Sequence, residues 1–82
     1  MKTEASAVEE IRTHLRTRVK ESKLSRGEIA DRTGLTKGVL ANVLRPGGAG
    51  LHVDRIVLIL NAVDIAPAAF YAGIYGFKEP LP

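Results

Sequence analysis

Two helix-start signals with a glycine between them constrain this chain more than any other feature of its sequence. Ser25 opens a capping box, in which its hydroxyl accepts a hydrogen bond from the amide of Glu28 and the Glu28 carboxylate reaches back. Thr36 is a favourable N-cap for a second helix, and Gly34 allows the left-handed conformation that ends the first. The pattern predicts two short helices joined by a tight turn, within residues 26–45.

Apolar spacing predicts a longer helix before this pair. Aliphatic residues recur at intervals of three and four, which is typical of the buried face of a helix. We expect this helix to run from about Glu4 to Ser22, with a stripe formed by Val8, Ile11, Leu15 and Val19.

After the pair, residues 46–50 (Pro-Gly-Gly-Ala-Gly) interrupt regular structure. A further helix is expected to begin between His52 and Asp54 and to continue through Val63. Its centre is apolar on all sides, so periodicity alone does not distinguish a buried helix from a buried strand. We predict a helix because no second strand is available to pair with it.

The end of the chain contributes one more short helix. Pro67 suits the first position of a helix, which we expect to end near Ala72 after a turn at residues 64–66. The sequence thus predicts an all-α, compact five-helix domain over residues 1–73, followed by an irregular tail over residues 74–82.

Composition excludes several classes of protein. The length of 82 residues allows one domain, and the absence of cysteine excludes disulfides and thiolate metal sites. No apolar run approaches the roughly 20 residues that span a bilayer, and the polar N-terminus is unlike a signal peptide, so we expect a cytoplasmic protein. His14 and His52 lie far apart and no catalytic motif is present, so we expect neither an enzyme nor a metal or cofactor site.

Positive charge is concentrated in the middle of the chain. The whole sequence has twelve Lys and Arg against nine Asp and Glu, but between Arg12 and Arg55 ten basic residues stand against four acidic ones. A basic centre of this kind favours a polyanionic partner such as nucleic acid. On charge alone, a solvated surface rich in arginine explains it equally well.

Spacing within residues 26–45 adds a more specific signal. A small residue stands where two helices must cross closely, a glycine lies in the turn, and apolar residues face inward from the second helix. Such spacing holds two short helices at a steep angle and lets the second protrude. The residues that carry this pattern are Ala30, Gly34, Leu35, Leu40 and Val43.

This pattern resembles the lambda-repressor/Cro-like (Xre-type) family of helix-turn-helix DNA-binding domains, over roughly residues 8–72. Two positions depart from the family. Thr33 flanks the turn where an apolar residue is usual, and Gly38 falls in the first turn of the second helix. Gly38 either allows close approach to a base or phosphate, or is tolerated near a helix terminus.

The resemblance implies that the second helix of the motif reads the major groove of double-stranded DNA while residues around it contact phosphates. Three further cations either flank the duplex or form a solvated face: Arg16, Lys20 and Lys23. The implied base contacts are Thr36, Lys37, Gly38, Ala41 and Asn42, and the implied phosphate contacts are Arg26, Arg45, Gly47, Gly48 and Arg55.

All four aromatic residues fall between Phe70 and Phe77, more than the small core is expected to absorb. Apolar surface of this kind marks interfaces, so we predict a two-fold homodimer. The alternative is that the tail folds back on its own domain. The expected interface residues are Tyr71, Ile74, Tyr75, Phe77 and Leu81.

The function predicted from these features is a sequence-specific transcriptional regulator, a repressor that binds a palindromic operator as a homodimer. The alternative is a protein-interaction module of the antitoxin type, whose apolar C-terminal segment binds a toxin or another partner protein. A third hypothesis, a nonspecific DNA-architectural protein, fits less well because a net charge of +3 is modest for that role.

Overall fold

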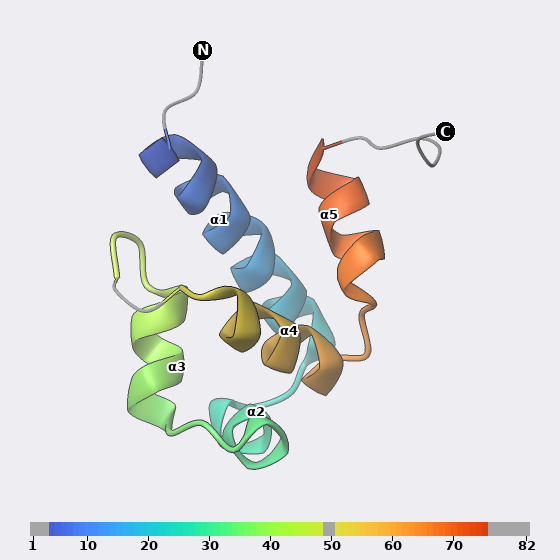
Figure 1. Ribbon diagram of the computed structural model, residues 1–82. Coiled ribbons are helices and arrows are strands. Elements are labelled where there is room, and N and C mark those ends of the chain that lie inside the picture. Colours follow the sequence, from blue (N-terminus) through green and yellow to red (C-terminus); the bar gives the residue numbers. More distant parts are fainter. Residues whose placement is uncertain (1–3, 49–50, 76–82) are drawn as a thin grey trace.

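The computed structural model describes residues 4–48 and 51–75, which fold into five helices (Figure 1). No strand occurs within these ranges, so the prediction of an all-α domain is confirmed. The helices are α1 (Glu4–Ser22), α2 (Arg26–Thr33), α3 (Lys37–Leu44), α4 (Val53–Ala62) and α5 (Pro67–Tyr75).

The two helix-start signals form as predicted. The amide of Glu28 donates to Ser25 Oγ at 3.1 Å, and the amide of Ser25 donates to Glu28 Oε1 at 2.9 Å. The hydroxyl oxygen of Thr36 accepts from the amide of Val39 at 3.1 Å and caps α3. Gly34 follows α2 with a φ of 78°, which is the left-handed conformation that turns the chain.

Thr33 replaces the expected apolar residue at the turn without leaving a polar atom unsatisfied. It is buried, and its hydroxyl donates to the main-chain oxygen of Ile29 at 2.8 Å. The hydroxyl oxygen of Thr33 also accepts a hydrogen bond from the amide of Leu35 at 3.1 Å. Its side chain therefore stabilises the turn between α2 and α3.

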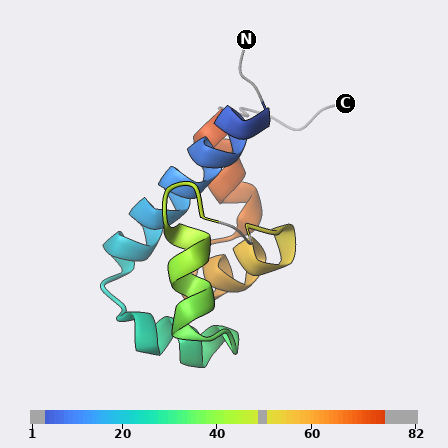
Figure 2. The ribbon, with the colours of Figure 1, turned by 90° about the vertical axis from the view of Figure 1, so that its left-hand side faces the viewer.

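The core lies where α1, α2, α3 and α4 meet, with Phe70 of α5 closing one side. Its fully buried side chains are Leu15, Ile29, Leu40, Val43, Leu44, Ile59 and Leu60. The backbone of α3 has only two helices near it, because α1 and α2 alone bring Cα atoms within 8 Å of α3. In the side view, α3 stands at the front of the molecule and α5 lies behind α1 (Figure 2).

Helix α5 is longer than predicted. It continues past Ala72 to Tyr75, so the predicted end near Ala72 is wrong, and residues 74 and 75, predicted to belong to the irregular tail, are helical. Packing supplies the physical reason. Ile74 is partly buried against the core, and this offsets the roughly 1 kcal/mol that a glycine costs inside a helix.

No single described helix is long and apolar enough to cross a membrane. Helices α4 and α5 are long and apolar enough only when taken together, and the chain bends by 108° at the break between them. The apolar character of the pair comes in part from buried core residues, including Ile56, Ile59 and Phe70.

Candidate nucleic-acid interface

Helix α3 presents one buried and one exposed face. Leu40, Val43 and Leu44 are buried in the core, whereas the side chains of Lys37 and Asn42 make no hydrogen bond or ion pair within the described part of the chain. All five residues predicted to contact bases lie together on or next to the exposed face: Thr36, Lys37, Gly38, Ala41 and Asn42.

Two arginines of α1 hold the carboxyl end of α3. Arg12 is buried, with a relative exposure of 2%, and its Nε donates to the main-chain oxygen of Val43 at 2.9 Å. Arg16 Nη1 donates to the main-chain oxygen of Leu44 at 3.3 Å. These carbonyls belong to the last turn of α3 and lack helical partners, so each guanidinium both satisfies an acceptor and complements the negative end of the helix dipole.

The loop after α3 is tied to the same side chains. Arg12 Nη2 donates to the main-chain oxygen of Gly48 at 2.6 Å, and Arg12 Nη1 donates to Glu9 Oε2. The second carboxylate oxygen of Glu9 accepts from the amide of Gly47 at 3.2 Å. A Cβ at position 48 would lie 2.0 Å from the main-chain oxygen of Asn42, so this close approach requires glycine.

These contacts argue against two of the predicted phosphate contacts. The amide of Gly47 is bonded to a carboxylate, and the amide of Gly48 donates to the main-chain oxygen of Arg45 at 2.8 Å within a buried residue. Both amides already have a hydrogen-bond partner within the described chain, which favours a structural role for Gly47 and Gly48 in the loop.

The structure leaves two of the other predicted phosphate contacts exposed on the α2–α3 pair and separates the third from α3. Arg26 and Arg45 are exposed at opposite ends of the α2–α3 pair. Lys37 extends over the first turn of α2, and its Cε lies 3.3 Å from where a Cβ on Gly27 would be. Arg55 is half-buried on α4, whose backbone stays beyond 8 Å from α3, so we leave it out of the proposed interface.

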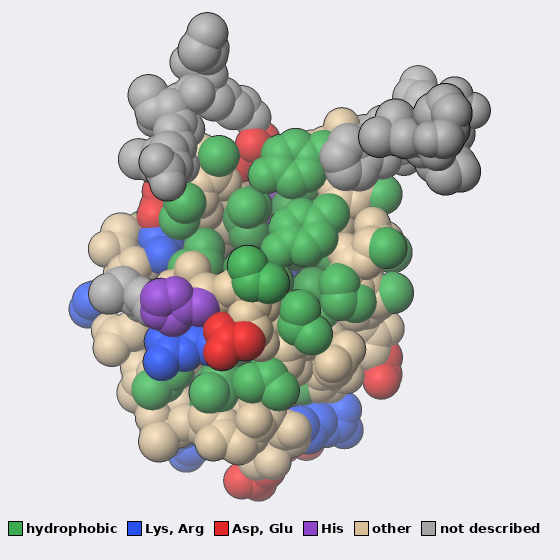
Figure 3. All heavy atoms as spheres, in the orientation of Figure 1, with side chains coloured by type: hydrophobic (Ala, Val, Ile, Leu, Met, Phe, Trp, Pro, Cys, Tyr) green, Lys and Arg blue, Asp and Glu red, His purple; other side chains and the backbone are tan. Residues whose placement is uncertain are grey.

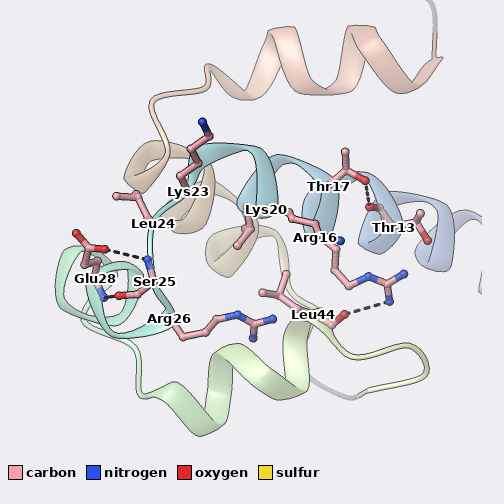
Figure 4. Close-up of a pocket in the computed structure, with 11 residues that line it drawn as sticks. Thr13, Arg16, Thr17, Lys20, Lys23, Leu24, Ser25, Arg26, Glu28 and Leu44 are labelled. Carbon is pink, nitrogen blue, oxygen red and sulfur yellow. Dashed lines mark hydrogen bonds between the residues drawn. The ribbon is translucent and has the colours of Figure 1, made fainter.

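A groove of about 790 Å³ lies between the outer face of α1, the start of α2 and the end of α3 (Figure 4). Arg16, Lys20, Lys23 and Arg26 all line it. In the close-up, the guanidinium groups of Arg16 and Arg26 extend into the space between α1 and α3, whereas the amine of Lys23 points the other way. The sequence indicated Arg26 as a phosphate contact and the other three as cations that flank a duplex or form a solvated face. The fold brings all four around one groove.

One carboxylate, that of Glu28, also lines the groove. Hydrogen bonds from the backbone amide of Ser25 and then from its side chain lower the pKa of Glu28, with a smaller contribution from Arg32. The carboxylate is therefore committed to the capping box as an anion and is not a counter-ion for the four cations.

The opposite side of the molecule carries apolar side chains over α1, α4 and α5 (Figure 3). Tyr71 and Ile74 are partly buried against the core, and the ring of Tyr75 stacks on that of Tyr71 with 6.4 Å between centroids. Burial raises the pKa of Tyr71, and Tyr75 adds to this effect. Tyr75 remains exposed, at 45%. The other predicted interface residues, Phe77 and Leu81, lie outside the described residues.

Sequence reasoning assigned no structural role to Arg12, although a signal for one exists. Arg12 falls within the apolar stripe of α1, four residues after Val8 and three before Leu15. A charged residue at such a position must be buried with partners. Its partners, two main-chain oxygens distant in sequence, could not be read from spacing.

Among the described residues, no group of three His, Cys, Asp or Glu side chains lies close enough to hold a metal ion. A scan against protein-family models, a search of curated proteins and a search of solved structures each found no match to this chain.

Proposed function

We propose that this protein is a sequence-specific regulator of transcription that binds double-stranded DNA through α3. The proposal rests on how α3 is held and on which of its side chains are exposed. Its outward side chains Lys37 and Asn42 have no partner within the described chain, while its inner face and its carboxyl end are fixed by the core and by Arg12. A rigid helix with an unused polar face is what major-groove reading requires.

The chemistry of the exposed face fits base edges. Asn42 has the donor and acceptor that pair with adenine N7 and N6, and Lys37 is a donor for guanine O6 and N7. Ala41 offers a methyl group to a thymine methyl. Arg26 and Arg45 are exposed at the ends of the α2–α3 pair, and as phosphate contacts they would fix the helix in the groove.

Fluorescence anisotropy tests this proposal with two labelled duplexes of about 30 bp, the region upstream of the reading frame and a scrambled copy. We expect the native duplex to bind about 10³-fold more tightly at near-physiological salt. Asn42→Ala should lose about 1–3 kcal/mol of preference at one base pair, whereas Asn61→Ala, the same change at an exposed position of α4, should leave preference intact. Equal binding of both duplexes would contradict sequence-specific recognition.

We further propose that two copies associate through the apolar face over α1, α4 and α5 and place two copies of α3 about 34 Å apart. The exposed Tyr75, stacked on Tyr71 of the same face, supports this. Sedimentation equilibrium at micromolar concentration should give twice 8.8 kDa. A mass near 8.8 kDa would exclude the homodimer.

The same apolar face supports a second candidate function, a module that binds a partner protein. That function predicts weak DNA binding without sequence preference, together with a monomeric mass. The anisotropy and sedimentation measurements therefore separate the two candidates.

A further inference from the structure

The chain makes a tight turn over residues 45–48, directly after α3. The amide of Gly48 donates to the main-chain oxygen of Arg45 at 2.8 Å, and Gly47 has a φ of 71°. Proline at the second position and a glycine with positive φ at the third are the features of a type II β-turn. The sequence of the turn therefore determines its shape, whereas its position depends on contacts with α1.

Two side chains of α1 hold this turn at separate points. Glu9 Oε1 accepts from the amide of Gly47 at 3.2 Å, and Arg12 Nη2 donates to the main-chain oxygen of Gly48 at 2.6 Å. Glu9 Oε2 accepts from Arg12 Nη1, so the two side chains also pair with each other. Both oxygens of the Glu9 carboxylate are therefore engaged, one by the turn and the other by Arg12.

The Glu9 carboxylate occupies the place at the Gly47 amide where the sequence predicted a phosphate. Its bond to Arg12 keeps it there, because Arg12 is only 2% exposed and a buried guanidinium requires a counter-ion. The other hydrogen bonds of Arg12 go to the uncharged main-chain oxygens of Val43 and Gly48. Releasing the carboxylate to admit a phosphate would leave the charge of Arg12 buried without this partner.

We propose that Glu9, although acidic, is a positioning residue for DNA binding, because its carboxylate fixes the turn from which the Arg45 side chain contacts phosphate. Arg45 is the first residue of the turn, its side chain is exposed, and its main-chain oxygen is bonded to Gly48. The inference rests on the proposed function and adds to it a residue of α1 that does not touch the duplex. Charge alone predicts the reverse, since removing an acid should strengthen binding to a polyanion.

The test measures the affinity of the full chain for a labelled random duplex of about 20 bp by fluorescence anisotropy. Glu9→Ala should bind about three- to fivefold more weakly than the unaltered protein, the effect of one exposed charge contact. Glu21→Ala is the matched control, because Glu21 is another acid of α1 paired with an arginine three residues away, Arg18. This control should bind at least as tightly as the unaltered protein.

Two further variants separate positioning from a general loss of structure. In an Arg45→Gln background, Glu9→Ala should no longer weaken binding, because the contact that Glu9 positions is already absent. Glu9→Gln keeps one carbonyl oxygen as an acceptor for the Gly47 amide and should recover part of the lost affinity. Thermal melts establish that each variant is folded at the temperature of the binding measurement.

Tighter binding by Glu9→Ala, as charge alone predicts, would overturn the proposal. Equal weakening by Glu9→Ala in the Arg45 and Arg45→Gln backgrounds would also overturn it. Either result leaves the proposed function intact if Asn42→Ala still loses base preference on the operator. Failure of the unaltered protein to bind any duplex would remove the proposed function together with this inference.

Hydrogen exchange gives a second readout that needs no DNA. In ¹⁵N-labelled protein, the amide of Gly47 should exchange with solvent faster in Glu9→Ala than in Glu21→Ala, because only the first variant removes its acceptor. Equal exchange rates in the two variants would show that the carboxylate does not hold the turn.

Discussion

Arg12 Nε donates a hydrogen bond to the main-chain oxygen of Val43 at 2.9 Å, across 31 positions of sequence. Through this bond a buried guanidinium on α1 fixes the carboxyl end of α3. Together with the buried side chains of Leu40, Val43 and Leu44, the bond holds the exposed face of α3 in one orientation with respect to the rest of the molecule.

Replacing Arg12 by methionine should destabilise the protein by about 3–5 kcal/mol, because two main-chain oxygens and the carboxylate of Glu9 lose their partner. Urea unfolding followed by circular dichroism measures the change. Arg18→Met removes the exposed pair with Glu21 and should stay within about 1 kcal/mol of the unaltered protein. Equal midpoints for the two variants would show that the bonds of Arg12 do not stabilise the fold.

Gly48→Ala and Gly38→Ala should have opposite signs. A Cβ at position 48 would lie 2.0 Å from the main-chain oxygen of Asn42, so the loop must move at a cost of about 1–3 kcal/mol. A Cβ at position 38 meets only Thr36 Oγ1, at 3.8 Å, and should stabilise α3 by up to about 1 kcal/mol. Thermal melting of the two variants measures whether each substitution raises or lowers stability. If Gly38→Ala also weakens binding to the operator, glycine is needed there for close approach to DNA.

Asp64 lies two residues after the end of α4 and has a φ of 60°, in the left-handed region that glycine adopts at lower cost than aspartate. Asp64→Gly should therefore stabilise the protein by about 0.5–1 kcal/mol. Asp31→Gly, at an exposed position inside α2, should instead destabilise it by about 0.3 kcal/mol, because aspartate ranks just above glycine in helix propensity. Denaturant midpoints compare the two, and a loss of stability in Asp64→Gly would mean that the aspartate side chain outweighs the strain.

The capping box predicts a specific dependence on pH. The pKa of Glu28 is lower in the folded chain than its ordinary value of 4.5, so its ionised form stabilises folding above pH 4.5 and loses this effect as the pH falls through the lower, folded-state pKa. Glu28→Gln keeps a hydrogen-bond acceptor but does not titrate. The melting temperature should therefore fall less between pH 7 and pH 3 in Glu28→Gln than in the unaltered protein. Parallel falls in both proteins would exclude this linkage.

Much of this fold could be predicted from sequence because its helix boundaries are set by local chemistry. The capping box at Ser25, the N-cap at Thr36 and the glycine at position 34 each determine the backbone within three residues of themselves. For this reason the predicted end of α2 and the predicted start of α3 agree with the structure. The end of α5 was missed because it depends on packing of Ile74 against residues distant in sequence.

The candidate site was only partly predictable. The exposed face of α3 follows from helical periodicity, so Lys37 and Asn42 appear there as expected. Whether the amides of Gly47 and Gly48 are available to a phosphate depends on their hydrogen bonds to Glu9 and Arg45. Only the folded chain shows those hydrogen bonds. The arrangement of Arg16, Lys20 and Arg26 around one groove likewise requires the crossing of α1 with α2 and α3.

The sparse surroundings of α3 have an evolutionary consequence. Since its backbone adjoins only α1 and α2, and its outer positions touch neither the core nor α5, substitutions at Lys37, Ala41 and Asn42 should leave stability and association nearly unchanged. Such positions are free to diverge among related chains and to be randomised in a library. Selection from a library at these three positions would therefore yield variants that retain the fold and differ in the ligand they prefer.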